Sequence, residues 1–167
     1  YRFCNACGGS MRFVRAGWLG MCEGCGSEHY PRTDQAVIVA VGDGKRLLLG
    51  RQASWPARRW SVVGGFVEPG ETLEMAVAHE VMEETGVRVR SSRYLASQPW
   101  PFPASLMMAF KAHAITTDVR VDGEETMTAR WVTRDEYTAE LIAGRMAAPG
   151  RATIARYMIE EWLGREL

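Results

Sequence analysis

The pattern of apolar and polar positions changes at the segment Tyr30-Pro31-Arg32. Before this segment the chain has too few apolar residues to build a core of its own. After it, short apolar runs with strand character alternate with longer amphipathic stretches, which is the pattern of an α/β domain. We therefore expect two parts, residues 1–33 and residues 34–167.

The second part predicts a mixed series of strands and helices. Apolar runs at 36–41 and 46–49 flank the turn signal Gly42-Asp43-Gly44 and predict a hairpin. Further strands are expected at 60–63, ended by Gly64-Gly65, and at 94–96, 106–115 and 130–132, with a proline-rich loop between 96 and 106. Helices are expected at about 72–85 with Gly86 as C-terminal cap, from about Thr133, and at roughly 152–163.

Three carboxylates gather on one face of the helix expected at 72–85. Glu80, Glu83 and Glu84 span roughly 100° of its circumference, so they can reach a common point in front of that face. Leu73 and Val77 form one stripe with Glu80 and Glu84, so two carboxylates continue an apolar row that should face the domain. Neither Glu80 nor Glu83 has a Lys or Arg within four residues.

Such a cluster has two interpretations, a solvated acidic face or a metal site. Like charges at this spacing destabilise a helix unless a cation lies among the oxygens. The apolar row and the missing bases favour a cation, and hard oxygen ligands suit Mg²⁺ or Mn²⁺, which in turn suit phosphate chemistry.

All four cysteines lie in the first part of the chain, as two Cys-x2-Cys pairs separated by fourteen residues: Cys4, Cys7, Cys22 and Cys25. Each pair has the spacing at which two thiolates bind one tetrahedral zinc ion. Two disulfides in a secreted fragment are the alternative, but no secretory signal accompanies the cysteines. Four protein ligands leave no open position, so the zinc is expected to be structural; His29 is a minor alternative contact.

Size and charge narrow the class of protein. A chain of 167 residues with 47% apolar and 24% charged residues can form an ordinary globular core. Zero formal net charge argues against a general nucleic-acid or membrane-surface binder. Binding of RNA would need a local basic patch, such as Arg51, Arg58 and Arg59. We see no apolar run of transmembrane length and no signal peptide at Tyr1, and expect a cytoplasmic protein with no membrane partner.

Residues 65–87, GFVEPGETLEMAVAHEVMEETGV, resemble the Nudix box, Gly-x5-Glu-x7-Arg-Glu-hydrophobic-x-Glu-Glu-x-Gly-hydrophobic. The matching positions are Gly65, Glu71, Glu80, Val81, Glu83, Glu84, Gly86 and Val87, and His79 stands where the family has arginine. Residues 97–105, SQPWPFPAS, resemble the SQPWPxPxS signature of the NADH pyrophosphatase branch. That branch also carries a four-cysteine zinc ribbon followed by a Tyr-Pro-Arg segment.

The resemblance implies a fold, a metal site and a substrate. The fold is an α/β/α sandwich around a mixed sheet, preceded by a small zinc ribbon. Catalytic Mg²⁺ or Mn²⁺ would be held by Glu80, Glu83 and Glu84, together with Glu125 (Glu124 competes for this role). Substrate-binding residues would be Tyr30, Phe66, Gln98, Trp100 and Ser105, with Trp100 reaching across the interface of a homodimer. The family usually adds an amino-terminal domain, which would precede Tyr1.

The implied activity is metal-dependent hydrolysis of NADH or NAD⁺ to AMP and a nicotinamide mononucleotide, and by the same chemistry of the NAD cap on RNA 5′ ends. Glu83 or Glu84 would orient or deprotonate the attacking water. Two alternatives remain: hydrolysis of another nucleoside diphosphate derivative such as ADP-ribose, or a non-catalytic zinc-ribbon binding module. Because histidine lacks the bidentate fork of arginine, His79 predicts a looser or more pH-sensitive site.

Overall fold

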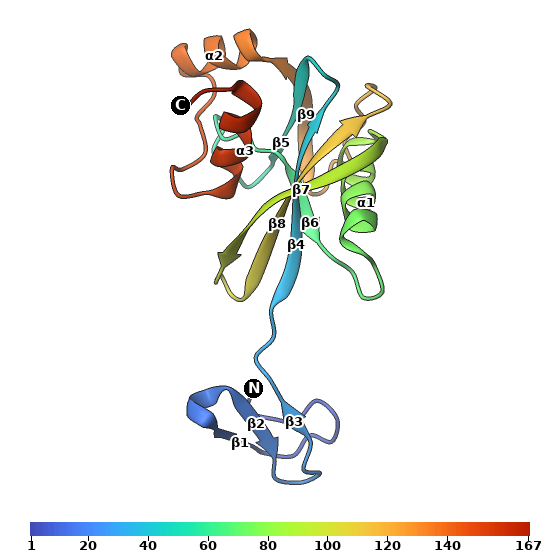
Figure 1. Cartoon of the computed structure of the whole chain (residues 1–167), viewed down its shortest axis with the longest axis vertical. Helices are drawn as coiled ribbons and strands as arrows, with labels where there is room; N and C mark the ends of the chain where they lie inside the picture. Colours follow the sequence, from blue (N-terminus) through green and yellow to red (C-terminus); the bar gives the residue numbers. More distant parts are fainter. The chain divides into compact units, whose positions relative to one another are not determined.

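A computed structural model describes residues 1–167 as two compact units, Tyr1–Thr33 and Asp34–Leu167, each of which is described by itself (Figure 1). The first unit is a three-stranded antiparallel sheet of β1 (Met11–Val14), β2 (Leu19–Cys22) and β3 (Glu28–His29). A short 3-10 turn, Arg15–Gly17, connects β1 to β2, which pair as an antiparallel hairpin. None of the helices has both the length and the apolar character needed to cross a bilayer.

The second unit is built on a mixed six-stranded sheet. Its strands are β4 (Asp34–Gly42), β5 (Arg46–Gln52), β6 (Val63–Phe66), β7 (Val89–Trp100), β8 (Ser105–Ala114) and β9 (Thr126–Thr133). The main order is β7-β8-β4-β5-β9, and β6 pairs with β4. Only the β4–β8 pair is parallel, with Ala36 beside Met107; the other pairs are antiparallel. The mixed sheet expected from the resemblance is therefore confirmed.

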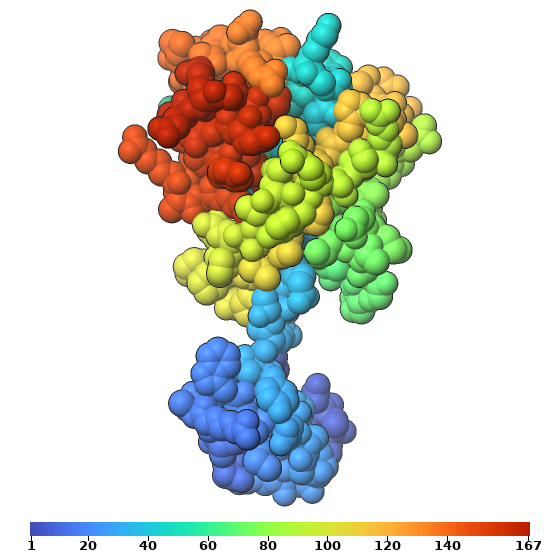
Figure 2. All heavy atoms as spheres, viewed as in Figure 1, coloured from blue at the N-terminus to red at the C-terminus, as the bar shows by residue number.

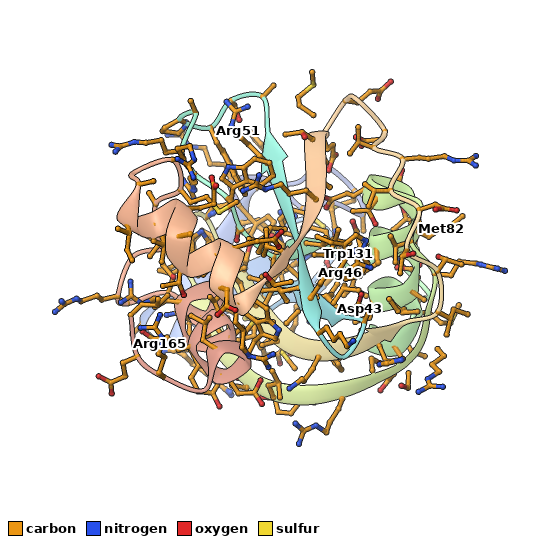
Figure 3. The ribbon with its side chains drawn as sticks, turned by 90° about the horizontal axis from the view of Figure 1, so that it is seen from above. Asp43, Arg46, Arg51, Met82, Trp131 and Arg165 are labelled. Atoms are coloured by element: carbon orange, nitrogen blue, oxygen red, sulfur yellow. The ribbon has the colours of Figure 1, made fainter.

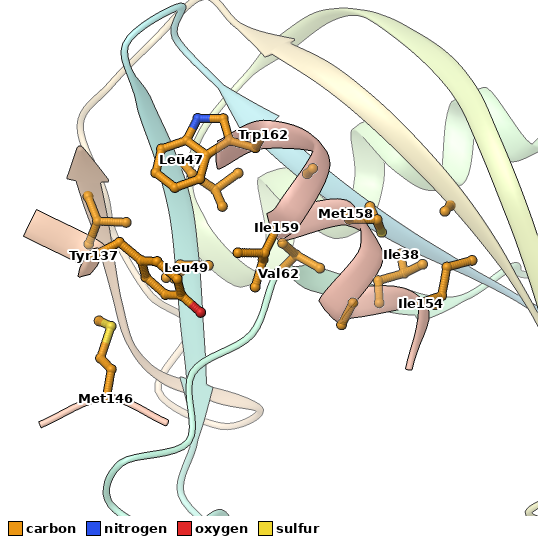
Figure 4. Close-up of a cluster of buried hydrophobic side chains, with 14 residues drawn as sticks. Ile38, Leu47, Leu49, Val62, Tyr137, Met146, Ile154, Met158, Ile159 and Trp162 are labelled. Atoms are coloured by element: carbon orange, nitrogen blue, oxygen red, sulfur yellow. The ribbon is translucent and has the colours of Figure 1, made fainter. Parts of the chain in front are cut away.

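Helices cover both faces of this sheet, which gives the expected α/β/α layers (Figure 1). Alternate residues of β4 point to opposite faces, as the strand period requires. Ile38 and Ala40 pack with α2 (Arg134–Ile142) and α3 (Ile154–Leu163), whose contribution includes Tyr137 and Met158 (Figure 4). On the other face, three valines of β4 pack against α1 (Leu73–Thr85).

Local signals set the ends of the helices where the sequence predicts them. Thr72 caps α1 by accepting a hydrogen bond from the N–H of Met75, and Gly86 ends the helix with φ 69°, a conformation that favours glycine. Thr133 forms a capping box with Glu136 at the start of α2, and Thr153 caps α3.

Several strand boundaries differ from the sequence prediction: β7 and β9 begin earlier than expected, and two further differences involve glycine and proline. The strand expected at 60–63 and ended by Gly64-Gly65 is instead β6, Val63–Phe66, which includes both glycines. Position 64 requires glycine because a β-carbon there would lie only 2.7 Å from the carbonyl oxygen of Val37. The expected proline-rich loop is shorter: β7 continues through Pro99 to Trp100, which pairs with Ser105. Because β7 is an edge strand, a proline costs it no inner hydrogen bond.

Candidate active site

Helix α1 directs two carboxylates inward. Val77 and Val81 are fully buried under the sheet, and Glu80 and Glu84, on the same side of the helix, are only 9% and 6% exposed. The carboxylate of Glu80 lies directly against Gly65 of β6, where any β-carbon would overlap it. The carboxylate of Glu84 accepts a 2.5 Å hydrogen bond from the hydroxyl of Thr126 at the start of β9. Two strands distant in sequence therefore fix the positions of these acids.

Burial changes the acid–base properties of this pair. Desolvation and the nearby charge of Glu84 raise the pKa of Glu80 to about 7. Desolvation also raises the pKa of Glu84, against the lowering effect of the hydrogen bonds from Thr126 and the N–H of Gly64. Buried carboxylates with raised pKa values are desolvated ligands that a divalent cation would stabilise in their ionised form.

Glu83, the third predicted carboxylate, points away from this pair. Its side chain is 61% exposed and lies 3.0 Å from Nε2 of His79. The Nδ1 atom of His79 lies 3.1 Å from the carboxylate of Glu71, close enough for an ion pair although not oriented as a hydrogen bond. His79 thus joins Glu71 in the loop before the helix to Glu83 in the helix.

The turn before β9 brings a fourth carboxylate into range. Asp122 shapes this turn by accepting hydrogen bonds of 2.9–3.2 Å from the N–H groups of Glu124, Glu125 and Thr126. Glu125 is exposed, and its charge raises the pKa of both Glu80 and Glu84. Because Glu125, and not Glu124, is among the main charges that raise these two pKa values, proximity favours Glu125 as the additional ligand.

The oxygens of the helix glutamates do not converge on one point in this structure. Three ligand atoms lie within 4.8 Å of one another only among the four cysteines and among Glu68, Glu71 and His79. The donor set around Glu80 and Glu84 nevertheless fits Mg²⁺ or Mn²⁺, because it consists of hard carboxylate oxygens, partly desolvated and without a basic partner in an ion pair.

A cleft of about 650 Å³ opens beside these carboxylates. Glu84 and Thr126 line it together with four of the predicted substrate residues, namely Phe66, Gln98, Trp100 and Ser105. Phe66 and Trp100 are exposed aromatics, and Trp100 packs edge-on against Phe102 with ring centroids 5.5 Å apart. Tyr30, the fifth predicted residue, belongs to the first unit, where its hydroxyl donates a 2.7 Å hydrogen bond to Glu28.

Gln98 has a structural role in the wall of this cleft. Its amide nitrogen donates to the carbonyl of Ala152 (2.6 Å), and its amide oxygen accepts from the N–H of Ile154 (2.8 Å). These bonds attach β7 to the start of α3, and the two elements lie side by side on the surface (Figure 2). Gln98 therefore shapes the cleft with its amide already engaged.

The four cysteines of the first unit have the geometry of a zinc site. None is in a disulfide, and their sulfur atoms lie within 4.8 Å of one another. The Cys4–Cys25 separation is 3.8 Å, which matches the spacing of about 3.8 Å across a tetrahedral zinc–thiolate centre. Hydrogen bonds from Ser27 and from backbone N–H groups lower the pKa of Cys4 to about 5, which favours its thiolate form. His29 contacts the sulfur of Cys4 at 3.4 Å, beside the four ligands.

Comparison with known families decides the assignment of the second unit. The NUDIX domain matches residues 31–157, most of the chain, including the helix that carries Glu80 and Glu84. The chain belongs to the Nudix family.

Relatives of this Nudix chain extend the likeness across its whole length. It is 44% identical over 99% of its residues to a protein named NAD-capped RNA hydrolase NudC in Mycobacterium tuberculosis, and 41% identical over 98% to NAD-capped RNA hydrolase NUDT12 of Homo sapiens. It covers 56% and 38% of those proteins, so the chain spans about half the length, or less, of the curated relatives that it matches.

Solved structures show the same Nudix architecture. A NUDIX hydrolase from Nitrosomonas europaea superposes with a TM-score of 0.74 at 27% identity, covering 99% of this chain and 95% of that one. The NUDIX domain of Shewanella oneidensis NrtR, solved with ADP-ribose, has a TM-score of 0.54 at 17% identity, with coverage of 68% and 79%. The second likeness concerns the fold alone.

Several residues of the Nudix cleft were not predicted from the sequence. Thr126 holds Glu84, Gly64 donates to it, and Trp55 lines the cleft with Arg59 stacked 4.5 Å over its ring. Thr126 lies 42 positions from its partner, and no local pattern distinguishes it from other strand threonines. Trp55 did carry a signal, because residues 55–60 combine two tryptophans and two arginines with no acidic residue, and Arg59 belongs to the basic patch suggested for RNA.

Proposed function

We propose that this chain is a metal-dependent hydrolase that cleaves the diphosphate linkage of NADH or NAD⁺, and of the NAD cap on RNA, to release AMP or the RNA 5′-monophosphate and a nicotinamide mononucleotide. One observation carries the proposal: the buried carboxylate Glu84, one helical turn beyond buried Glu80, lines an aromatic-lined cleft of about 650 Å³. The names of relatives at 41–44% identity support the choice of substrate.

The catalytic centre of this proposal consists of Glu80, Glu83, Glu84 and Glu125, which would hold Mg²⁺ or Mn²⁺. The bound cation supplies charge neutralisation at the diphosphate and lowers the pKa of a coordinated water. Glu84, fixed by Thr126, presents an immobile ligand, whereas exposed Glu83 is free to turn toward the cleft once its contact with His79 is released. Glu83 or Glu84 would orient or deprotonate the water that attacks phosphorus, and the bond to the bridging oxygen breaks.

Recognition of the dinucleotide is assigned to the walls of the cleft. Phe66 and Trp100 offer faces on which flat bases can stack, worth about 1–3 kcal/mol per base. Ser105 and Gln98 shape the pocket between them, and Tyr30 is retained as a substrate residue on the strength of the family resemblance alone. A homodimer, in which Trp100 serves the neighbouring subunit, is also proposed from that resemblance.

The four cysteines complete the proposal as a structural zinc ribbon, residues 1–33, before a Nudix domain of residues 34–167. A zinc site of four thiolates persists in reducing compartments, which supports the expected cytoplasmic location.

Product analysis tests the function. The protein is incubated with Mg²⁺ or Mn²⁺ and NADH, ADP-ribose or NAD-capped RNA, and the products are identified by mass. AMP and reduced nicotinamide mononucleotide from NADH, lost in Glu84→Gln but kept in the matched control Glu74→Gln on the exposed side of α1, support the proposal. Turnover of ADP-ribose alone would show that ADP-ribose, and not NADH, is the substrate. No turnover of any of the three compounds would support a non-catalytic module.

A further inference from the structure

A second cavity, of about 440 Å³, lies at the opposite end of the sheet from the catalytic cleft. Its lining includes Gly42 at the end of β4 and Lys111 and His113 near the end of β8, whereas the cleft is lined by the starts of the same strands. Strand β5 shows the same separation: Arg46 belongs to this cavity and Arg51 to the cleft, at its two ends (Figure 3). The two sites are therefore distinct.

Basic residues from four elements line this cavity, and no acidic residue does. Arg93 of β7, Lys111 of β8 and Arg134 of α2 lie here with His113, whereas the guanidinium of Arg46 of β5 stacks 5.2 Å over Trp131, which packs on the α1 side of the sheet. Positive charges gathered in a concave wall repel one another and focus a field that attracts anions.

Only part of this charge is neutralised within the chain. Arg46 donates to Asp43 at 2.7 Å, and Lys111 contacts both oxygens of Glu161 at 3.1 and 3.2 Å. Arg134 bonds a carbonyl oxygen and stacks 5.0 Å over Trp162, which leaves its charge uncompensated by any carboxylate. The guanidinium of Arg93 has neither an ion pair nor a hydrogen bond.

The strand register makes this arrangement costly. Arg93 lies directly opposite Lys111 in the β7–β8 pair, and like charges directly opposite destabilise a sheet. An anion with about two negative charges would relieve the repulsion between them and match the excess of Arg93 and Arg134. Ser91, which also lines the cavity, lies on the same face of β7 as Arg93, and its hydroxyl adds a neutral hydrogen-bond donor for the oxygens of the anion.

We propose that the cavity lined by Arg93, Lys111 and Arg134 is a phosphate-binding site separate from the catalytic cleft. The phosphate belongs to a small phosphorylated molecule or to the backbone of a nucleic acid. This assignment does not depend on the reaction proposed for the cleft.

Calorimetric titration of the full chain with inorganic pyrophosphate, without added Mg²⁺ or Mn²⁺, tests the site. Arg93→Ala should weaken binding about tenfold or more, because charge-assisted hydrogen bonds are lost, and it should leave folding intact since Arg93 supports no other residue. Adding Lys111→Ala should abolish binding. Arg90→Ala, an exposed arginine on the same strand outside the cavity, is the matched control and should bind as the wild type does.

Competition with a short uncapped RNA then shows which molecule carries the phosphate. If the RNA displaces pyrophosphate from the wild type, the ligand is a nucleic acid; if it does not, the ligand is a small phosphorylated molecule. Equal affinity of wild type and the Arg93→Ala/Lys111→Ala variant would overturn the proposal. So would loss of binding in Arg51→Ala alone, because the anion would then lie in the cleft.

Discussion

The hydroxyl of Thr126 donates a 2.5 Å hydrogen bond to the carboxylate of Glu84, across 42 positions of sequence. Both groups are buried, so water does not replace the bond if it is lost. Through this bond the start of β9 fixes the orientation of a carboxylate on α1.

Replacing Thr126 with valine should therefore reduce activity while preserving shape. Without the hydroxyl, Glu84 loses a donor that lowers its pKa and keeps its oxygen in position, and we expect kcat to fall by about tenfold to a hundredfold. Thr126→Ser keeps the hydroxyl and is the control. Equal kcat for the valine and serine variants, measured at saturating metal, would show that the bond has no part in catalysis.

Gly65 should tolerate no side chain, because a β-carbon there would overlap the carboxylate of Glu80. We expect Gly65→Ala to lower the free energy of unfolding by about 1–3 kcal/mol and to weaken metal binding. The same substitution in a Glu80→Ala background should cost much less, since the overlapping group is gone. Equal costs in the two backgrounds, from urea unfolding, would contradict this contact.

The pKa of about 7 for Glu80 predicts how the metal-free protein responds to pH. Between pH 4.5, the ordinary pKa of a glutamate, and pH 7, the folded state binds more protons at Glu80 than the unfolded state does. The contribution of Glu80 to the free energy of unfolding is therefore fully present below pH 4.5 and is lost as pH rises through 7. The free energy of unfolding should fall by up to about 3 kcal/mol across this range. The check is urea unfolding of wild type and Glu80→Gln: the variant should lack this slope, and Mg²⁺ should restore the wild type at pH 7.

His79 predicts a pH effect at the loop before α1. Burial lowers its pKa, but the charges of Glu71 and Glu83 outweigh burial and raise it. Its ion pairs are therefore complete below pH 6.5 and are lost as pH rises through the raised pKa. In His79→Arg the charge persists, so the ratio of its kcat/KM to that of wild type should increase with pH above neutrality. A constant ratio would exclude this role.

Zinc removal should unfold the first unit and leave the second intact. The first unit has almost no apolar core besides its cysteines, whereas the second has buried clusters on both faces of its sheet. A strong chelator should expose residues 1–33 to proteolysis while 34–167 stays resistant. Cys22→Ser should behave like the chelated protein, and Ser27→Ala, which keeps all four ligands, should not.

The sequence predicts those parts of this molecule that depend on neighbouring residues. The ends of α1 follow from Thr72 and Gly86, and the burial of Glu80 and Glu84 follows from the stripe they share with Val77. Periodicity misses contacts between distant segments, such as the hydrogen bond from Thr126 of β9 to Glu84 of α1.

The same limit explains β6. Gly64 and Gly65 were interpreted as the end of a strand, because glycine usually interrupts strands. Glycine is needed at these two positions because Val37 and Glu80 approach them from other elements. A local sequence pattern does not contain these contacts.

The double hydrogen bond of Gln98 gives the molecule two independently anchored halves around its cleft. The acids are fixed by α1, β6 and β9, while the Trp100 end of β7 is tied to α3. Under the hydrolase function proposed above, changes near Trp100 can therefore alter which base is accepted without disturbing the acids, so preference among dinucleotides can drift while bond cleavage is retained.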